Sequence, residues 1–469
     1  MNNRRCFLPL SALLGVLLFS CTRDAKDEPV PDEKAEPVIE WIDNTMRTHY
    51  LWFDEIPEPA KLDYTLEPDA FFKTLLSSKD GKVKNDTHYY YSAITKKKEA
   101  TKAYQGGSLS LGFEYQYYYI GDLEKYALRV LYIIPHSPAS EVDIRRGDWI
   151  YEINGSPVGD DLVAQLNSGA EMRLGISDSI SPVTISRQPT LSARTIEDSP
   201  VFLSKVLHAG NKKVGYLVYN HFTAGPKEDG TDVAFDNELR TVFAEFKGEE
   251  PDEFVLDLRY NGGGIVTSSR LLATMLAPES ALDKVFCKLT YNSKGGDPYT
   301  FTLAKESMNN SGVQGANLNL KRLFVITGNR TASASEAVIN GLKPYMEVIL
   351  VGEQTEGKNV GSLVYEDDRF EWELHPIVCT LSNSLGFSDY ADGFSPDYEY
   401  TEVWESTFSN LGDEEEYLLH KVLQYIATGT FPRRASLRAA TGGGAIIPLG
   451  GSLDRRSVNG VILPASFGR

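Results

Sequence analysis

The sequence is poor in cysteine and lacks the common metal-binding motifs. Only four cysteines occur in 469 residues, and only Cys287 and Cys379 fall in the part expected to fold. No CxxC pair and no HExxH occurs, so neither a metal site nor a cofactor site is predicted. Whether the two cysteines pair is open, because an oxidising compartment permits a disulfide and two buried thiols fit equally well.

Basic residues are also in short supply. The chain has 47 lysines and arginines against 65 aspartates and glutamates, a formal net charge of −18. Proteins that bind nucleic acid present a basic face, so nucleic acid is not an expected partner. The hydrophobic fraction of 42% and the charged fraction of 24% are typical of a globular protein, and the length suits roughly three domains.

Long hydrophobic runs are nearly absent, and the one at the N-terminus is short. It extends from Phe7 to Phe19 after Arg4 and Arg5, too short for a membrane span, and it predicts a signal peptide over residues 1–20. The run ends in "FSC", which resembles a bacterial lipobox. That resemblance implies acylation of Cys21 and a lipid anchor in the cell envelope, expected in the outer membrane. The alternative is an ordinary signal peptide that ends beside a cysteine.

The rest of the chain divides by composition. Residues 21–36 are an acidic tether, and residues 37–104 have the helical spacing of a small, mainly helical domain. Residues 105–195 contain strand-like runs with turn signals. Residues 196–430 alternate strand and helix patterns, which predicts an α/β domain. Residues 431–469 carry six arginines and one acid among many glycines and serines, a composition typical of an extended or disordered tail.

Three turn signals recur in order within residues 105–195. "SPA" precedes "GD", a short strand and "NG", and this order resembles a PDZ domain. The resemblance implies that Leu111, Gly112 and Phe113 form a loop whose N–H groups bind a chain-terminal carboxylate. The bound peptide would add a strand to the edge of the sheet. The alternative is a small β domain with ordinary turns.

Three polar motifs follow apolar strands in the α/β segment. They are "DLRYNGGG" at 257–264, "NRTASASE" at 329–336 and "EQTEGK" at 353–358. In α/β folds such turns lie at the carboxyl ends of strands, where ligands bind. The glycines of the first motif allow backbone N–H groups to approach a ligand closely.

The second and third motifs contain a candidate nucleophile and base. Ser333 and Glu336 have the spacing of a capping box, which needs no catalysis. A helix start also offers free N–H groups and a positive dipole end, which would stabilise an oxyanion. Lys358 is a surface lysine in the simplest interpretation. If buried, its pKa falls, and it can take the proton of a serine.

Together these motifs resemble the C-terminal processing peptidases, also called tail-specific proteases, over about residues 105–425. The resemblance implies that Ser333, not Ser335, is the nucleophile and that Lys358 is the general base. It also implies an α/β fold related to the crotonase and Clp-protease spiral of ββα units, with an inserted PDZ-like domain beside the active-site groove. The oxyanion-binding or supporting residues implied are Gly262, Gly263, Gly264, Ala334 and Glu336.

The sequence departs from that family at two positions. Many members have proline where this chain has Gly262, and many have glutamine where it has Ser362. That glutamine orients the lysine, so what orients Lys358 is left open. A distant branch of the family uses histidine as base, and His221, at the end of "YLVYNHF", is the alternative base.

The expected function is therefore a lipid-anchored serine endopeptidase that cleaves proteins near unstructured C-terminal tails. The alternative from another class is a non-catalytic peptide- or ligand-binding protein on the same fold. Retention of both Ser333 and Lys358 favours the enzyme. Acyl-CoA chemistry, suggested by fold analogy alone, suits an exported protein poorly.

Overall fold

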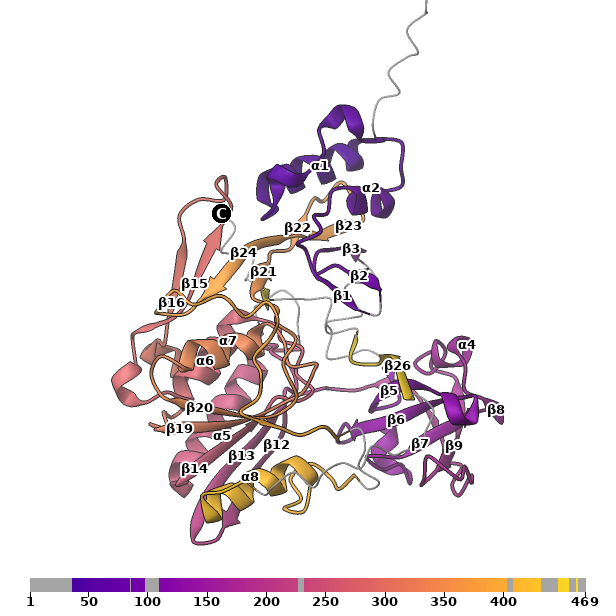
Figure 1. Ribbon diagram of the computed structural model, residues 1–469, viewed down its shortest axis with the longest axis vertical. Helices are drawn as coiled ribbons and strands as arrows, with labels where there is room; N and C mark the ends of the chain where they lie inside the picture. Colours follow the sequence, from indigo (N-terminus) through magenta and orange to yellow (C-terminus); the bar gives the residue numbers. More distant parts are fainter. Residues whose placement is uncertain are drawn as a thin grey trace, which may run out of the picture.

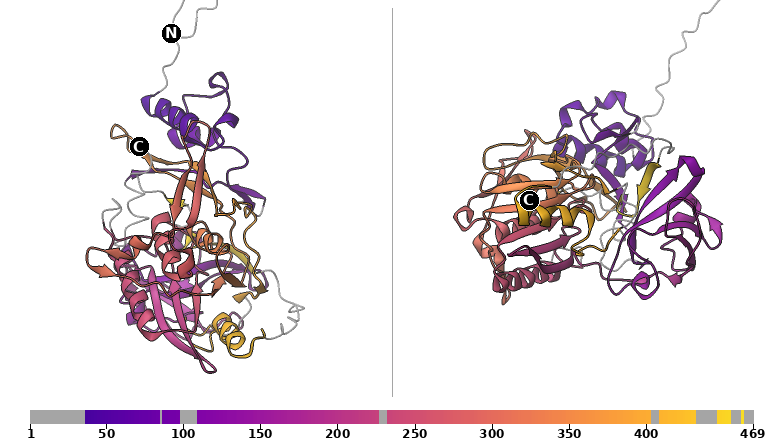
Figure 2. Two further views of the ribbon diagram at one scale, coloured as in Figure 1. Left: turned by 90° about the vertical axis from the view of Figure 1, so that its left-hand side faces the viewer. Right: turned by 60° about the horizontal axis from the view of Figure 1, so that its bottom comes forward.

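The computed structural model describes residues 36–84, 86–97, 109–226, 232–402, 408–431, 446–454 and 461–462. The predicted signal peptide, Cys21 and all but the last residue of the predicted tether lie outside these residues. Figures 1 and 2 show an N-terminal domain, a central α/β core and a β domain at the side of the core. Within the described ranges, no helix is both long and apolar enough to cross a membrane.

The N-terminal domain combines helices with short strands. Its amphipathic first helix buries Ile39, Ile42 and Met46, which recur at helical spacing and pack in one hydrophobic cluster. The expected mainly helical domain also contains three strands, and one of these, β3, pairs with β23 (Trp372–His375) of the core. The domain is therefore joined to the core by a shared sheet. Its elements are α1 (Pro37–His49), α2 (Pro68–Thr74), β1 (Lys82–Lys84), β2 (Thr87–Tyr89) and β3 (Ala93–Lys96).

The β domain contains one main sheet whose strand order is β10-β9-β7-β6-β5-β26, with β8 paired to β7. Alternating apolar residues of these strands form a separate core that includes Leu128, Ile150 and Leu174. Its elements are β4 (Leu109–Ser110), β5 (Phe113–Ile120), β6 (Lys125–Ile133), β7 (Trp149–Ile153), β8 (Ser156–Pro157), α4 (Asp160–Val163), β9 (Glu171–Ser177), β10 (Thr190–Ser192) and β11 (Arg194–Thr195).

The α/β core is built on a sheet of order β12-β13-β14-β19-β20-β25. Strands β12 and β13 form an antiparallel pair, and β13 to β25 run parallel. Helices α5, α6 and α7 cover one face of the sheet and share one hydrophobic cluster with it. Helix α8 covers the other face over a second hydrophobic cluster. The elements are β12 (Val201–Ala209), β13 (Lys212–Tyr219), α5 (Ala234–Glu249), β14 (Glu253–Asp257), α6 (Val266–Leu276), β19 (Arg322–Thr327), α7 (Ala334–Leu342), β20 (Glu347–Gly352), β25 (Tyr398–Glu399) and α8 (Tyr417–Thr428).

A second sheet, of order β16-β15-β24-β21-β27, stands beside these helices. Buried Cys287 of β15 and Cys379 of β24 are free thiols, so the disulfide left open by the sequence is not formed. The elements are β15 (Val285–Tyr291), β16 (Tyr299–Thr302), β21 (Val360–Ser362), β24 (Ile377–Ser382) and β27 (Val461–Ile462); the short pairs β17 (Asn309–Asn310) with β18 (Val313–Gln314) and β22 (Tyr365–Glu366) with β23 complete the core.

The C-terminal region differs from the expected extended or disordered tail. Residues Ile446–Gly451 form β26, which pairs with β5 of the β domain, and the backbone of β27 pairs with β21. Composition did not indicate these two strands, because the strands with which they form hydrogen bonds lie far away in the sequence. The rest of the tail lies outside the described residues.

Candidate active site

Ser333 lies in the turn between β19 and α7. It is the N-cap residue of α7, with φ +56° and ψ −111°, a backbone conformation that is costly for a residue other than glycine. The side chain is 1% exposed. Ser333 and Glu336 have the predicted capping-box arrangement, but among the described residues Ser333 Oγ has no partner at normal hydrogen-bond distance and angle. The turn thus holds a buried, unpaired hydroxyl at a helix N-terminus.

Glu336 connects this turn to the loop that carries Lys358. Its buried carboxylate accepts hydrogen bonds from the backbone N–H groups of Ser333 (2.8 Å), Gly357 (2.7 Å) and Lys358 (2.8 Å), and from Thr355 Oγ1 (2.6 Å). Burial raises the pKa of Glu336 to about 7, although these four hydrogen bonds oppose the rise. The supporting role predicted for Glu336 therefore has a geometric basis, because one carboxylate fixes both loops.

Lys358 is almost completely buried, with 2% of its surface exposed. Its Nζ has no hydrogen-bond partner in the described part of the chain and lies 4.7 Å from the centre of the Tyr91 ring. Burial lowers the pKa of Lys358 to about 8, and the nearby carboxylates of Asp80, Glu356 and Glu336 partly offset the effect. A lysine with this pKa is partly neutral at physiological pH and can act as a base.

Two of the groups around Lys358 come from the N-terminal domain, which sequence analysis did not connect with the site. Asp80 is buried and accepts hydrogen bonds from Tyr50 Oη (2.9 Å), Tyr91 N (2.9 Å) and Ser92 N (3.1 Å). Tyr91 Oη donates to Glu356 Oε1 at 3.4 Å. No motif marks Asp80 or Tyr91 in the sequence, since their relation to Lys358 arises only when the domains pack together.

Ser333 and Lys358 are not hydrogen bonded to each other, since neither Oγ nor Nζ has a partner within the described part of the chain. Catalytic hydrogen bonds are often long in free enzymes and shorten when substrate binds. Ser362, the residue at the position of the family's glutamine, is buried on β21. It does not orient Lys358 through a hydrogen bond, because Nζ makes none with any described residue. Instead, Nζ is surrounded by an aromatic ring and carboxylates.

The glycine turn of "DLRYNGGG" packs directly against Ser333. Gly263 and Gly264 have φ values of +106° and +134°, which favour glycine. A Cβ on Gly263 would lie 2.7 Å from Ser333 Cβ and 3.0 Å from Ala334 N. Glycine is therefore required there for the backbone of the turn to approach the helix start.

The N–H groups of this region are not all available to an oxyanion. The Gly263 N–H donates to Asn261 Oδ1 at 2.9 Å, so this residue does not offer the donor that was expected. The N–H groups of Gly262 and Ala334 have no acceptor among the described residues. Ser335 Oγ donates to Asn261 O at 3.0 Å, which gives the second serine of the motif a structural contact between α7 and the turn.

His221, the alternative base, has other partners. Its Nδ1 is 2.9 Å from Thr223 Oγ1, and its Nε2 is 3.1 Å from Asp198 O. Its neighbour Phe222 pairs with Gly264, so the histidine lies near the glycine turn, as the sequence suggested. The structure nevertheless connects Lys358, and not His221, to the carboxylate that holds Ser333.

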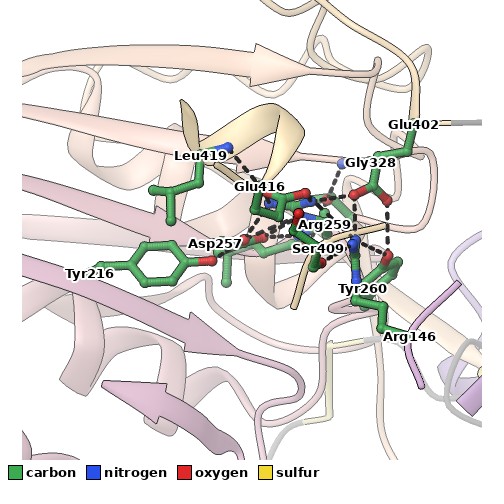
Figure 3. Close-up of polar contacts among 12 residues, drawn as sticks. Arg146, Tyr216, Asp257, Arg259, Tyr260, Gly328, Glu402, Ser409, Glu416 and Leu419 are labelled. Carbon is green, nitrogen blue, oxygen red and sulfur yellow. Dashed lines mark hydrogen bonds and ion pairs between the residues drawn. The ribbon is translucent and has the colours of Figure 1, made fainter. Parts of the chain in front are cut away.

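A buried ion-pair network lies behind the glycine turn (Figure 3). Arg259 Nη2 lies 2.7 Å from Asp257 Oδ2 and 3.0 Å from Glu416 Oε2 at the start of α8. Tyr216 Oη donates to Asp257 Oδ2 at 2.8 Å. Each of these ionic groups is buried, so removal of one partner would leave an uncompensated charge. The "DLR" part of the motif therefore anchors the strand end before the turn.

The same network extends into the β domain. Arg146, which precedes the "GD" turn, donates to Tyr260 Oη at 3.1 Å and to Ser409 O at 2.8 Å, and it also pairs with Glu402. Tyr260 Oη donates to Glu402 Oε2 at 2.8 Å. Burial by itself raises the pKa of Glu402, but Arg146 and Arg259 lower it to about 2. Charged side chains thus join the β domain to the core beside the glycine turn.

The expected carboxylate-binding loop already has partners for two of its N–H groups. Gly112 has φ +89°, and its N–H donates to Ser110 Oγ at 3.0 Å. The Leu111 N–H donates to Asn167 Oδ1 at 3.2 Å. Phe113 is buried at the start of β5. A terminal carboxylate would have to displace both side-chain acceptors.

Comparisons with known proteins agree with this architecture. The model of Peptidase family S41 matches residues 213–371, and that of the Peptidase S41 N-terminal domain matches residues 38–98. A carboxyl-terminal-processing protease of Picosynechococcus is 27% identical over 246 residues, which cover 51% of this chain and 52% of that protein. A carboxy-terminal-processing protease of Bartonella bacilliformis is 23% identical, over 65% of this chain and 64% of that protein.

The chain spans about half the length of the first curated relatives that it matches. One solved structure matches a larger share of this chain than those relatives do. The crystal structure of a putative S41 protease from Bacteroides fragilis is 35% identical, with a TM-score of 0.71, over 83% of this chain and 97% of that one. Because sequence and fold agree over nearly all of that relative, the chain belongs to peptidase family S41, a family of serine peptidases.

Proposed function

We propose that this protein is a serine endopeptidase in which Ser333 is the nucleophile and Lys358 is the general base. The observation that carries the proposal is a pair of buried polar groups, Ser333 Oγ and Lys358 Nζ, that have no hydrogen-bond partner among the residues that the structure describes. Both belong to loops held by the same Glu336 carboxylate. Buried polar groups are normally paired, so two unpaired ones on adjoining loops point to a substrate that supplies the missing interactions.

The chemistry follows from the geometry. Ser333 Oγ attacks the scissile carbonyl carbon, and its proton passes to Lys358 Nζ. The C–N bond then breaks, and Lys358 returns the proton to the leaving amine, which leaves an ester on Ser333. Water, deprotonated by Lys358, attacks the ester carbon; the bond to Ser333 Oγ breaks, and Lys358 returns the proton to Oγ. The lysine gains charge when it accepts the proton, and the carboxylates of Asp80 and Glu356 stabilise that charge.

The carbonyl oxygen becomes negative in the tetrahedral intermediate. The free N–H groups of Gly262 and Ala334 are suited to receive it, and the N-terminus of α7 adds a positive dipole. Gly263 contributes through its missing side chain, which lets the turn approach Ser333.

The substrates proposed are proteins with unstructured C-terminal tails, presented by the β domain acting as a PDZ-like module. This finer proposal is supported by the names of the relatives and by the pairing of β5, the outermost strand that the domain itself contributes, with the distant segment β26, which shows that an extended segment can add there as a strand. A lipid anchor at Cys21 in the bacterial cell envelope, expected in the outer membrane, remains a proposal from the sequence.

The test is mass spectrometry of an unfolded protein substrate incubated with wild type, Ser333→Ala and Ser335→Ala. We expect wild type to cut, Ser333→Ala to be inactive, and Ser335→Ala to retain measurable cleavage because the Ser335 hydroxyl donates to the backbone Asn261 O, which is a structural contact. The same substrate without its free tail should be cut more slowly. Equal cleavage by wild type and Ser333→Ala would exclude Ser333 as nucleophile. No cleavage by wild type would favour the non-catalytic binding protein.

A further inference from the structure

The edge of β5 is occupied by a segment from the other end of the chain. Strand β26 pairs antiparallel with β5, from Ile446 opposite Ile120 to Gly451 opposite Gln116. Figure 1 shows β26, in yellow, beside β5 at the side of the β domain nearest the core. This is the sheet edge where a substrate strand is expected to add, so the chain's own C-terminal segment takes the place of a peptide.

The segment is held by more than the strand ladder. Ser452 Oγ accepts a hydrogen bond from Tyr115 N at 2.8 Å, and Ser452 N donates to Tyr115 O at 3.0 Å. The Gln116 side chain donates to Gly450 O. Leu453 is 3% exposed in the hydrophobic cluster beneath α8. These contacts continue the strand geometry past the end of β26 and add an apolar anchor.

The last described residue of the segment reaches the loop of the nucleophile. Asp454 Oδ1 lies 2.5 Å from Arg330 Nη1, and Arg330 is three residues before Ser333. Arg330 also donates to Gln116 Oε1 at 2.5 Å. Asp454 is the only acidic residue among residues 431–469. A single arginine thus connects the serine loop, β5 and the bound segment.

The segment has the direction of a PDZ ligand but is not a chain end. It runs along β5 toward the loop of Leu111 and Gly112, whose N–H groups already donate to Asn167 and Ser110. No terminal carboxylate is needed there, and the chain continues to β27, whose backbone pairs with β21, two residues after Lys358. The β5 edge therefore accepts an internal extended segment.

We propose that the edge of β5 together with Arg330 is a binding site for internal extended peptide segments, and that residues 446–454 are its resident intramolecular ligand. The ligand chemistry is read from the occupant: small residues opposite Tyr115 and Gln116, then a leucine, then an acidic residue for Arg330. The inference deepens the proposed function, on which it rests, by naming the segment that a protein substrate must displace. A tethered ligand competes at millimolar effective concentration, so displacement controls access.

The first experiment locks the segment in place in the full-length chain. Tyr119 and Ile447 are Cα partners across β5 and β26, so the Tyr119→Cys/Ile447→Cys pair can form a cross-strand disulfide. The probe is a fluorescent peptide of sequence IIPLGGSLD with an amidated C-terminus, bound to Ser333→Ala protein so that it is not cut. Oxidation should weaken probe binding at least tenfold, and a reductant should restore it, while Tyr119→Cys alone should respond to neither. Equal binding before and after oxidation would show that β26 is a permanent structural strand and would overturn the proposal.

The second experiment weakens the binding of residues 446–454 to the β5 edge without a covalent bond. Asp454→Arg places a cation opposite Arg330 and should strengthen binding of the probe at least threefold by loosening the competitor. The matched control is Asp368→Arg, at an exposed aspartate in the turn between β22 and β23, which should leave binding unchanged. Urea unfolding midpoints of both variants check that the fold is retained. Unchanged binding in a folded Asp454→Arg protein would count against the proposal.

The third comparison tests the ligand class. The amidated probe and the same peptide with a free carboxylate should bind within threefold of each other. A free acid that binds more than tenfold tighter would show that the site selects chain ends and would overturn the internal-segment assignment. Binding is measured in Ser333→Ala protein, so it needs no peptidase activity. Loss of the proposed function and loss of this inference are therefore distinguishable.

Discussion

Replacing Lys358 by methionine should abolish peptidase activity and stabilise the protein. Methionine has a similar length and no charge. Lowering the pKa of Lys358 from 10.5 to about 8 corresponds to roughly 3 kcal/mol by which burial destabilises the charged folded state. The variant also loses the cation–π contact with the Tyr91 ring, which reduces its gain in stability by roughly 1 kcal/mol. The expected net gain in the free energy of unfolding at pH 7 is therefore about 2 kcal/mol.

The pH dependence of this gain follows from linkage. Below pH 8 the lysine is protonated in both the folded and the unfolded wild type, so the full penalty is present. Between about pH 8 and 10.5 the unfolded chain binds more protons than the folded one, because the folded pKa is the lower. Wild-type stability should then rise by up to roughly 1.4 kcal/mol per pH unit relative to Lys358→Met. The advantage of the variant should shrink across that range.

The assay is urea unfolding of both proteins at pH 7 and pH 9.5, with cleavage of an unfolded substrate measured in parallel. The matched control is Lys288→Met on the exposed side of β15, expected to change stability by less than about 0.5 kcal/mol and to leave activity intact. A Lys358→Met protein that is less stable than wild type at pH 7 would refute the reasoning, because it would mean that the lysine is well solvated or paired. Full activity in that variant would exclude Lys358 as the base.

Three further outcomes are expected. The logarithm of kcat/KM should rise with pH and level off above about pH 8, because only neutral Lys358 accepts the proton of Ser333; a plateau already reached near pH 6.5 would indicate a histidine base. Glu336→Gln should lower kcat more than tenfold and cost about 1–3 kcal/mol in urea unfolding, since an amide cannot accept all four hydrogen bonds. Gly263→Ala should lose activity through its contact with Ser333, whereas Gly262→Ala, which has no positive φ, should keep more of it in a kinetic comparison.

The local features of the site were predictable from the sequence because each depends on neighbouring residues. An apolar strand followed by "NRTASASE" indicates a strand, a turn and a helix start, and the structure has β19, the turn with Ser333 as N-cap, and α7. The glycines of "YNGGG" likewise predict an unusual turn, and two of them have positive φ. The alternation of strand and helix patterns over residues 196–430 predicted the α/β core, and helices α5 and α8 each bury one face against its sheet.

Only the tertiary structure decided which distant groups meet. Tyr91 and Asp80 surround the amine of Lys358, although the N-terminal domain gives no sequence sign of a role in the site. One contact between near neighbours was also not predictable: the Gly263 N–H donates to the Asn261 side chain, which depends on side-chain direction and not on spacing. The composition of the C-terminal segment predicted a tail, but residues 446–451 form β26. This strand forms because the edge of β5 supplies backbone hydrogen bonds and because Arg330, near Ser333, pairs with Asp454. A pKa, a free donor and a strand partner are all set by packing, and packing joins residues that the sequence keeps hundreds of positions apart.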